Sequence, residues 1–170
     1  MRITSCGVTT SDEDGHDRSD VTLPPVGSAW RETWSLPVNR DPITVSEMDL
    51  RYKYFAANVD MTVSGMPFIR PSGHHPIIDL GLSLKWVEKR LAVGDDAAFG
   101  FTEHLEVIHI RGAGPTVAIE SSEFSYRAEA DRSTLLAELA RFTESVYQRL
   151  VQEVAGIGGN PVVQRLRPSA

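Results

Sequence analysis

The chain has 170 residues, a formal net charge of −6 and a single cysteine, Cys6. This length suits one domain with a sizeable core, and one cysteine excludes a framework of intrachain disulfides. Lysines and arginines are scattered, so the basic face that a phosphate backbone requires is missing and we expect no nucleic-acid partner. No segment approaches the ~20 apolar residues of a membrane helix or contains a signal-peptide core. We therefore expect a cytoplasmic protein without membrane contact.

Residues 1–28 are predicted to form a flexible acidic arm, and residues 29–170 a single α+β domain. The arm is rich in serine, threonine, aspartate and glycine, and its five acidic and two basic side chains give it a net charge of −3. It has few large apolar side chains, so burial cannot offset the conformational entropy that ordering would cost.

Two strands are predicted in the first part of the domain. Over residues 47–55 apolar and charged side chains alternate with the period of a half-buried strand, the apolar positions being Met48, Leu50, Tyr52 and Tyr54. The alternation changes phase near Asn58, which predicts a turn or bulge before a second strand over 59–63. Gly65 ends that strand.

Residues 76–92 fit either a strand or a helix by periodicity, and we predict a helix. The segment is too long for an average strand. Pro76 suits a first helical position, Asp79 suits the first turn, and Gly94 suits the stop.

Strands are expected next over 99–110, 116–120 and 124–128, followed by a long amphipathic helix that Ser133 or Thr134 caps and Gly156 ends. One apolar stripe runs along that helix, formed by Leu135, Leu139, Phe142, Val146, Leu150 and Val154. The tail over 162–170 is left open between an edge strand and a loose segment. Because hairpin-length connections dominate, the predicted fold is α+β: a mostly antiparallel sheet of about five strands packed against two helices, the longer one C-terminal.

His74, His75 and Asp79 form the first candidate site. They surround a predicted helix start, and the spacing of His75 and Asp79 would let them ligate one metal or act as a base and its orienting group. The alternative is that both histidines lie in a loop between Gly73 and Pro76, where they are solvated or cap the helix.

A second group of ligand-type residues lies in the strand predicted over 99–110. It consists of Glu103, His104, Glu106 and His109. In a regular strand His104 and Glu106 share one face while the other two point to the opposite face, so at most two ligands converge. The default interpretation is therefore a polar outer strand face, and we expect neither a metal nor a cofactor.

Nucleophile and phosphate-binding motifs are missing from the sequence. Neither Ser64-Gly65 nor Ser72-Gly73 has the small-residue framing of a nucleophile elbow, and the glycines near residues 112 and 156 lack the lysine or the strand-to-helix setting of a phosphate loop. We therefore expect that the chain is not an enzyme.

The order of features from Leu50 to Ala155 resembles small bacterial proteins of unknown function and immunity proteins that neutralise polymorphic toxins. The resemblance depends on the strand pair, the Pro-Ile-Ile-Asp-Leu-Gly-Leu-Ser-Leu helix, the Phe-Gly-Phe-Thr-Glu strand, the hairpin and the terminal helix. It implies a non-enzymatic, cytoplasmic protein-binding module that inhibits a toxin or enzyme by masking it, and the acidic bias favours a basic toxin domain as partner. The alternative is a small metal-dependent or acid-base enzyme that uses His74, His75 and Asp79. The oligomeric state is not predicted.

Overall fold

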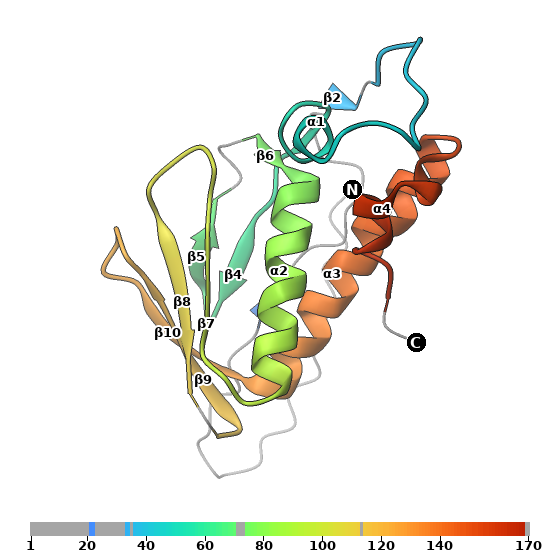
Figure 1. Cartoon of the computed structure of the whole chain (residues 1–170). Coiled ribbons are helices and arrows are strands. Elements are labelled where there is room, and N and C mark those ends of the chain that lie inside the picture. The colour runs from blue at the N-terminus through green and yellow to red at the C-terminus, as the bar shows by residue number, and fades with distance from the viewer. Residues whose placement is uncertain (1–20, 23–32, 35, 71–73, 113, 169–170) are drawn as a thin grey trace, which may run out of the picture.

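The computed structural model describes residues 21–22, 33–34, 36–70, 74–112 and 114–168 (Figure 1). In these residues the helices are α1 (Glu47–Tyr52), α2 (Ile77–Ala92), α3 (Arg132–Glu153) and α4 (Pro161–Gln164), with a 3-10 turn, η1 (Ile157–Gly159). The strands are β1 (Val21–Thr22), β2 (Thr33–Trp34), β3 (Phe55–Ala57), β4 (Met61–Val63), β5 (Met66–Ile69), β6 (His75–Pro76), β7 (Ala97–Gly100), β8 (Val107–Arg111), β9 (Thr116–Ser121) and β10 (Arg127–Asp131). The predicted α+β class with antiparallel pairing is confirmed.

The strands form three small sheets, so the prediction of one sheet of about five strands against two helices is wrong. The largest sheet has four strands in the order β10-β9-β8-β7, and two further sheets have the orders β1-β4-β5 and β2-β3-β6. The strands before α2 have only two to four residues. The pairing of β4 with β5 is also irregular, because consecutive residues Met61 and Thr62 pair with Ile69 and Pro67, which leaves one extra residue in β5.

The segment 47–55 was expected to be a strand, but it begins as helix α1. Ser46 caps the helix, its Oγ accepting a hydrogen bond of 3.2 Å from the main-chain N–H of Asp49. Within the helix Leu50 is buried, whereas Met48 and Tyr52, four residues apart, are both exposed. The alternation of apolar and charged residues therefore does not correspond to a strand, because the first part of the segment is helical.

The segment 99–110 was expected to be one strand, but it contains two. Strand β7 ends at Gly100 and β8 begins at Val107, and these two residues pair with each other across the hairpin. Residues 101–106 form the connecting loop. In a strand, Glu103 would point to the face opposite His104 and Glu106. A loop does not impose this alternation, so all three side chains can point toward one site.

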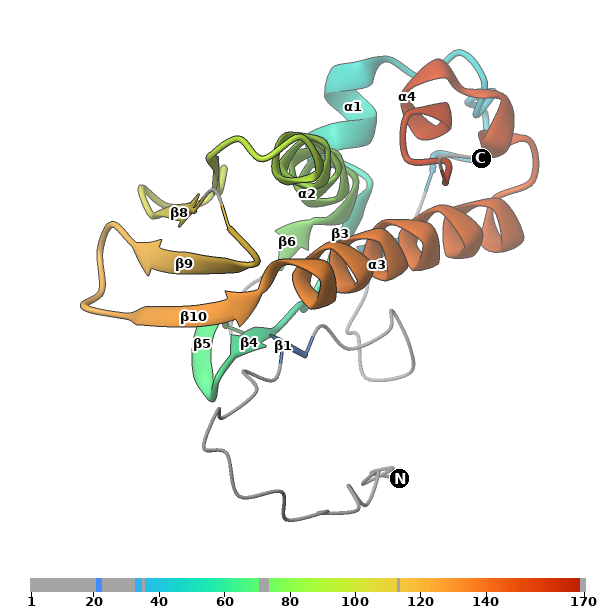
Figure 2. The same ribbon diagram turned by 90° about the horizontal axis from the view of Figure 1, so that it is seen from below.

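Helices α2 and α3 are confirmed and form the centre of the core. Figures 1 and 2 show them side by side, with the four-stranded sheet next to α2. The predicted stripe of α3 is buried at Leu135, Leu139, Phe142, Val146 and Leu150. Asp131, one turn before the predicted caps, caps this helix by accepting a hydrogen bond of 2.8 Å from the N–H of Thr134.

The chain after α3 packs back on the core. Helix α3 ends at Glu153, where Val154 is extended, three residues before the predicted stop; Gly156, with a φ of 84° that favours glycine, lies in the turn that leads into η1. The tail over 162–170, expected to be an edge strand or loose, contains α4, in which Val162 and Val163 are buried. Asn160 precedes this helix as its N-cap. Its side-chain amide donates hydrogen bonds to main-chain carbonyl oxygens of the segment 42–45.

Val21 and Thr22 pair with β4, so this part of the predicted arm belongs to a sheet. The other residues of 1–28 lie outside the described residues, and their expected flexibility stays a prediction. Within the described part of the chain, no helix is both long enough and apolar enough to span a bilayer.

Candidate functional site

Chain topology brings several segments to one end of the four-stranded sheet. In an antiparallel meander, alternate connections lie at the same end, so the β7–β8 loop and the β9–β10 turn are neighbours. Helix α2 precedes β7 and packs against it, and the two are joined by a short connection, so the N-terminal end of α2 lies at that same end (Figure 1). His74 and His75 immediately precede α2. Residues far apart in the sequence are therefore brought together.

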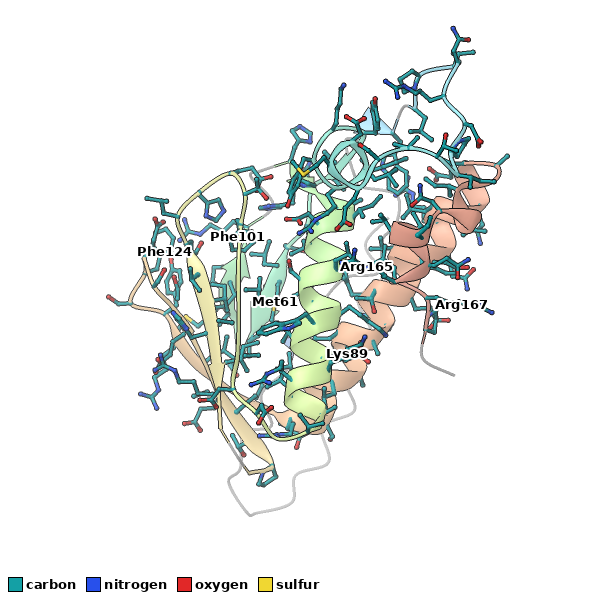
Figure 3. All side chains as sticks on the ribbon, in the orientation of Figure 1. Met61, Lys89, Phe101, Phe124, Arg165 and Arg167 are labelled. Carbon is teal, nitrogen blue, oxygen red and sulfur yellow. The ribbon has the colours of Figure 1, made fainter. Side chains whose placement is uncertain are left out.

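These segments enclose a pocket of about 320 Å³. Its lining residues come from the end of β5, the start of α2, the β7–β8 loop and the β9–β10 turn: Phe68, Ile69, Arg70, His74, His75, Phe101, Glu103, His104, Glu106, Glu123 and Phe124. Figure 3 shows Phe101 and Phe124 at this end of the sheet. The volume is suited to a small molecule, and the mixture of aromatic walls with a few ionisable groups is typical of ligand sites.

Three side chains in the pocket are arranged as metal ligands could be. Donor atoms of His104, Glu106 and Glu123 all lie within 4.8 Å of one another. The Nδ1 atom of His104 is 3.8 Å from Oε2 of Glu106. The other oxygen of Glu106, Oε1, accepts a hydrogen bond of 2.6 Å from Ser121 Oγ, which fixes the carboxylate in the way that supporting hydrogen bonds fix metal ligands.

Among the described residues, His75 is a buried polar residue without a hydrogen bond of normal geometry. Its exposed fraction is 5%, and neither ring nitrogen has a hydrogen-bond partner among the described residues. Burial lowers the pKa of His75, and it outweighs both the backbone of Arg70 and the charge of Glu103, which act in the opposite direction. The ring therefore carries a free lone pair near neutral pH. Its Nδ1 is 3.9 Å from Oε2 of Glu103.

Aromatic contacts hold the histidines in place. The ring of His104 lies against Phe101, with 4.4 Å between the ring centroids, and the His75 centroid is 6.4 Å from that of His104. Phe101 also contacts His75, at 5.4 Å between centroids. The two imidazoles thus share one aromatic wall and border the same space.

Arg70 lies on the aromatic side of the pocket. Its guanidinium stacks over Phe124, with Cζ 4.4 Å from the ring centroid, and donates a hydrogen bond to the hydroxyl of Tyr126. Phe124 and Tyr126 are themselves stacked, with centroids 5.3 Å apart. Among the described residues no carboxylate forms an ion pair with Arg70.

Asp79 lies close to His75 in sequence, but its carboxylate has other partners. Its Oδ1 accepts hydrogen bonds from the guanidinium of Arg51, from Nε at 2.7 Å, and its Oδ2 accepts one of 3.1 Å from Thr102 Oγ1. Asp79 does not line the main pocket, although it borders a much smaller depression next to His75. Its interactions tie α1 and the β7–β8 loop to the start of α2.

The structure thus joins the two candidate groups that the sequence suggested and rearranges both. His74 and His75 line the same pocket as Glu103, His104 and Glu106, whereas Asp79 and His109 do not. His109 lies within β8 and pairs with Ala98 and Glu120. Sequence reasoning missed Glu123 and Arg70. The glutamate follows two serines in a turn, and no local signal links it to His104, which is 19 positions earlier in the sequence.

A second hollow, of about 340 Å³, lies between β7, α2, α1 and α4. It is lined by Arg51, Leu82, Ser83, Trp86, Ala98, Phe99, Gly100 and Arg165. Trp86 is 50% exposed, and β7 is the edge strand of its sheet. An exposed tryptophan beside an open sheet edge is suited to contact with another chain.

No protein-family model, curated protein or solved structure matches this chain. The resemblance to immunity proteins therefore stays a prediction. The main pocket and the hollow beside Trp86 are the two features of the structure that suggest a function.

Proposed function

We propose that the chain binds a divalent transition-metal ion in the main pocket and uses it to act on a small molecule. One observation carries the proposal: His104, Glu106 and Glu123, from two different connections of the sheet, place donor atoms within 4.8 Å of one another in a pocket of ligand size. An independent observation is that His75, buried in the same pocket, has no hydrogen bond of normal geometry to any described residue, which leaves its ring nitrogens available to a ligand. The proposal keeps the metal-dependent alternative from the sequence and moves its centre from Asp79 to His104.

The donor types favour zinc or a related ion. Imidazole nitrogen and carboxylate oxygen are both zinc ligands, and three protein ligands leave a coordination position for water or substrate. Such an ion lowers the pKa of bound water and polarises a substrate oxygen. Glu103 is a carboxylate of the same pocket outside the ligand set, and it is available to transfer protons as a general base.

Metal titration tests this proposal directly. Protein purified without a histidine tag and stripped with a chelator should take up one Zn²⁺ per chain, measured by calorimetry and elemental analysis. His104→Ala and Glu123→Gln should each weaken Zn²⁺ binding about tenfold or more, because each removes one of few ligands. His109→Ala and Glu129→Gln are matched controls on the same sheet and should bind Zn²⁺ like the wild type.

Two outcomes would contradict the proposal. One is the lack of stoichiometric uptake of Zn²⁺, Mn²⁺ or Fe²⁺ by the stripped wild-type protein. The other is uptake that His109→Ala weakens as strongly as His104→Ala, because that result would mean surface binding. Circular dichroism of every variant separates loss of ligand from loss of fold.

The second hollow supports the other function suggested by the sequence, binding of a protein partner. The observation in its favour is the half-exposed Trp86 beside the open edge of β7. A partner captured from native lysate by the wild type should be lost with Trp86→Ala and retained with Val93→Ala, an exposed control just after the end of the same helix. If the partner is a basic toxin domain, as an immunity-type inhibitor requires, its association rate should fall as salt rises.

A further inference from the structure

Arg70 is a cation at the pocket that forms no ion pair with any carboxylate in the part of the chain that the structure describes. Its guanidinium is positioned by the ring of Phe124 and by the hydroxyl of Tyr126, and the hydrogen bond to Tyr126 leaves other N–H donors of the guanidinium available. Arg51 is different, because its guanidinium forms ion pairs with both Glu47 and Asp79. Stacking fixes the plane of the Arg70 guanidinium, and a fixed planar fork recognises carboxylate or phosphate oxygens well.

The charges that face the pocket make anion binding depend on the metal. Three carboxylates line it, those of Glu103, Glu106 and Glu123, against the single guanidinium of Arg70. Without a metal this arrangement repels an anion. A divalent cation at Glu106 and Glu123 would neutralise both of its carboxylate ligands, leaving the charge of Glu103 balanced by that of Arg70. With the net charge of these groups at zero, an anionic group could then contact both the ion and the guanidinium without net repulsion.

The other lining residues indicate the size and polarity of the part of the ligand that is not its anionic group. Phe68, Ile69, Phe101 and Phe124 supply an apolar wall, and about 320 Å³ accommodates a molecule with one ring or a short aliphatic chain. We propose that the ligand is a small organic anion whose carboxylate or phosphate group bridges the metal ion and Arg70 while its apolar body lies against these aromatic side chains. This inference rests on the proposed metal site and names the class of substrate that the site takes.

Calorimetric titration of the Zn²⁺-loaded protein with phenylacetate, phenyl phosphate and the neutral phenylacetamide tests the inference. At least one anion should bind, and it should bind at least tenfold more tightly than phenylacetamide. The stronger of the two anions identifies the headgroup. Arg70→Gln should weaken anion binding about 10- to 100-fold, because it removes a charge-assisted hydrogen bond. Arg127→Gln, at an exposed arginine of β10, is the matched control and should have no effect.

The same titrations separate failure of this inference from failure of the metal proposal. Zn²⁺ affinity should be unchanged in Arg70→Gln, because the arginine is not a ligand. Removal of Zn²⁺ should abolish anion binding, and the anion should tighten Zn²⁺ binding by the same factor, as linkage requires. If Zn²⁺ binds but phenylacetamide equals both anions, or if neither anion binds, the metal site stands and the anion inference is overturned. Anion binding that persists in the stripped protein also overturns it.

Discussion

Asn160 and His75 are buried polar residues in different regions of the molecule, and they differ in the hydrogen bonds that their side chains form. Asn160, 1% exposed, has its amide nitrogen 3.0 Å from three main-chain carbonyl oxygens of the segment 42–45, and its Oδ1 accepts a hydrogen bond of 2.9 Å from Val162 N–H. His75, 5% exposed, has no hydrogen-bond partner for either nitrogen among the described residues. Asn160 is the N-cap of α4, whereas His75 lies in β6, one residue before Pro76, the N-cap of α2.

The difference separates a structural use of polarity from a functional one. A buried polar group that leaves water without gaining a partner costs folding free energy. Asn160 avoids this cost by joining two distant segments of the chain. His75 incurs it at the edge of a pocket lined by His104, Glu106 and Glu123, where a bound ion or ligand would supply the missing partner. The Asn160 end stabilises the fold, and the His75 end is suited to binding.

The largest effect on stability is expected in the apolar core shared by both ends. Phe142 is 1% exposed in the buried stripe of α3, so Phe142→Ala should lower the free energy of unfolding by about 3 to 5 kcal/mol in urea denaturation. Glu144→Ala, on the exposed side of the same helix, is the control and should change it little. Equal losses from the two substitutions would show that the orientation of α3 is wrong.

Asn160→Leu should give the next largest effect, about 3 kcal/mol. The substitution keeps the number and branching of the side-chain heavy atoms, replaces the amide by two bulkier methyl groups, and leaves the carbonyl oxygens of segment 42–45 and the N–H of Val162 without their partner. Denaturation in urea measures the loss. A variant as stable as the wild type would mean that water replaces the amide, and the contrast with His75 would then disappear.

His75→Phe is the matching substitution at the other end and should have the smallest effect on stability, within about 1 kcal/mol. Because the imidazole nitrogens have no partner to lose, an apolar ring of similar shape leaves no group unsatisfied. A loss of stability as large as that of Asn160→Leu would break the comparison and give His75 a structural role.

Local patterns in the sequence were sufficient for the two main helices. The stripe of α3 repeats over several turns, so the buried face of α3 follows from local physics, although the helix ends three residues before Gly156. Helix α2 follows similarly from its length and its terminal residues. Patterns shorter than two turns were ambiguous. Over 47–55 a short apolar alternation predicted a strand, but the segment begins as a helix that Ser46 caps.

Only the tertiary structure determined the candidate site. The sequence pointed to His74, His75, Glu103, His104 and Glu106, but it placed them in two separate groups. It also predicted Glu103, His104 and Glu106 in a strand, whereas they lie in a loop. Their convergence follows from the chain turning after Gly100 and from the meander that places the β9–β10 turn, with Glu123, beside the β7–β8 loop. Distances between such segments depend on strand pairing and helix packing. No local sequence pattern records them, because the residues interact only after the chain has folded.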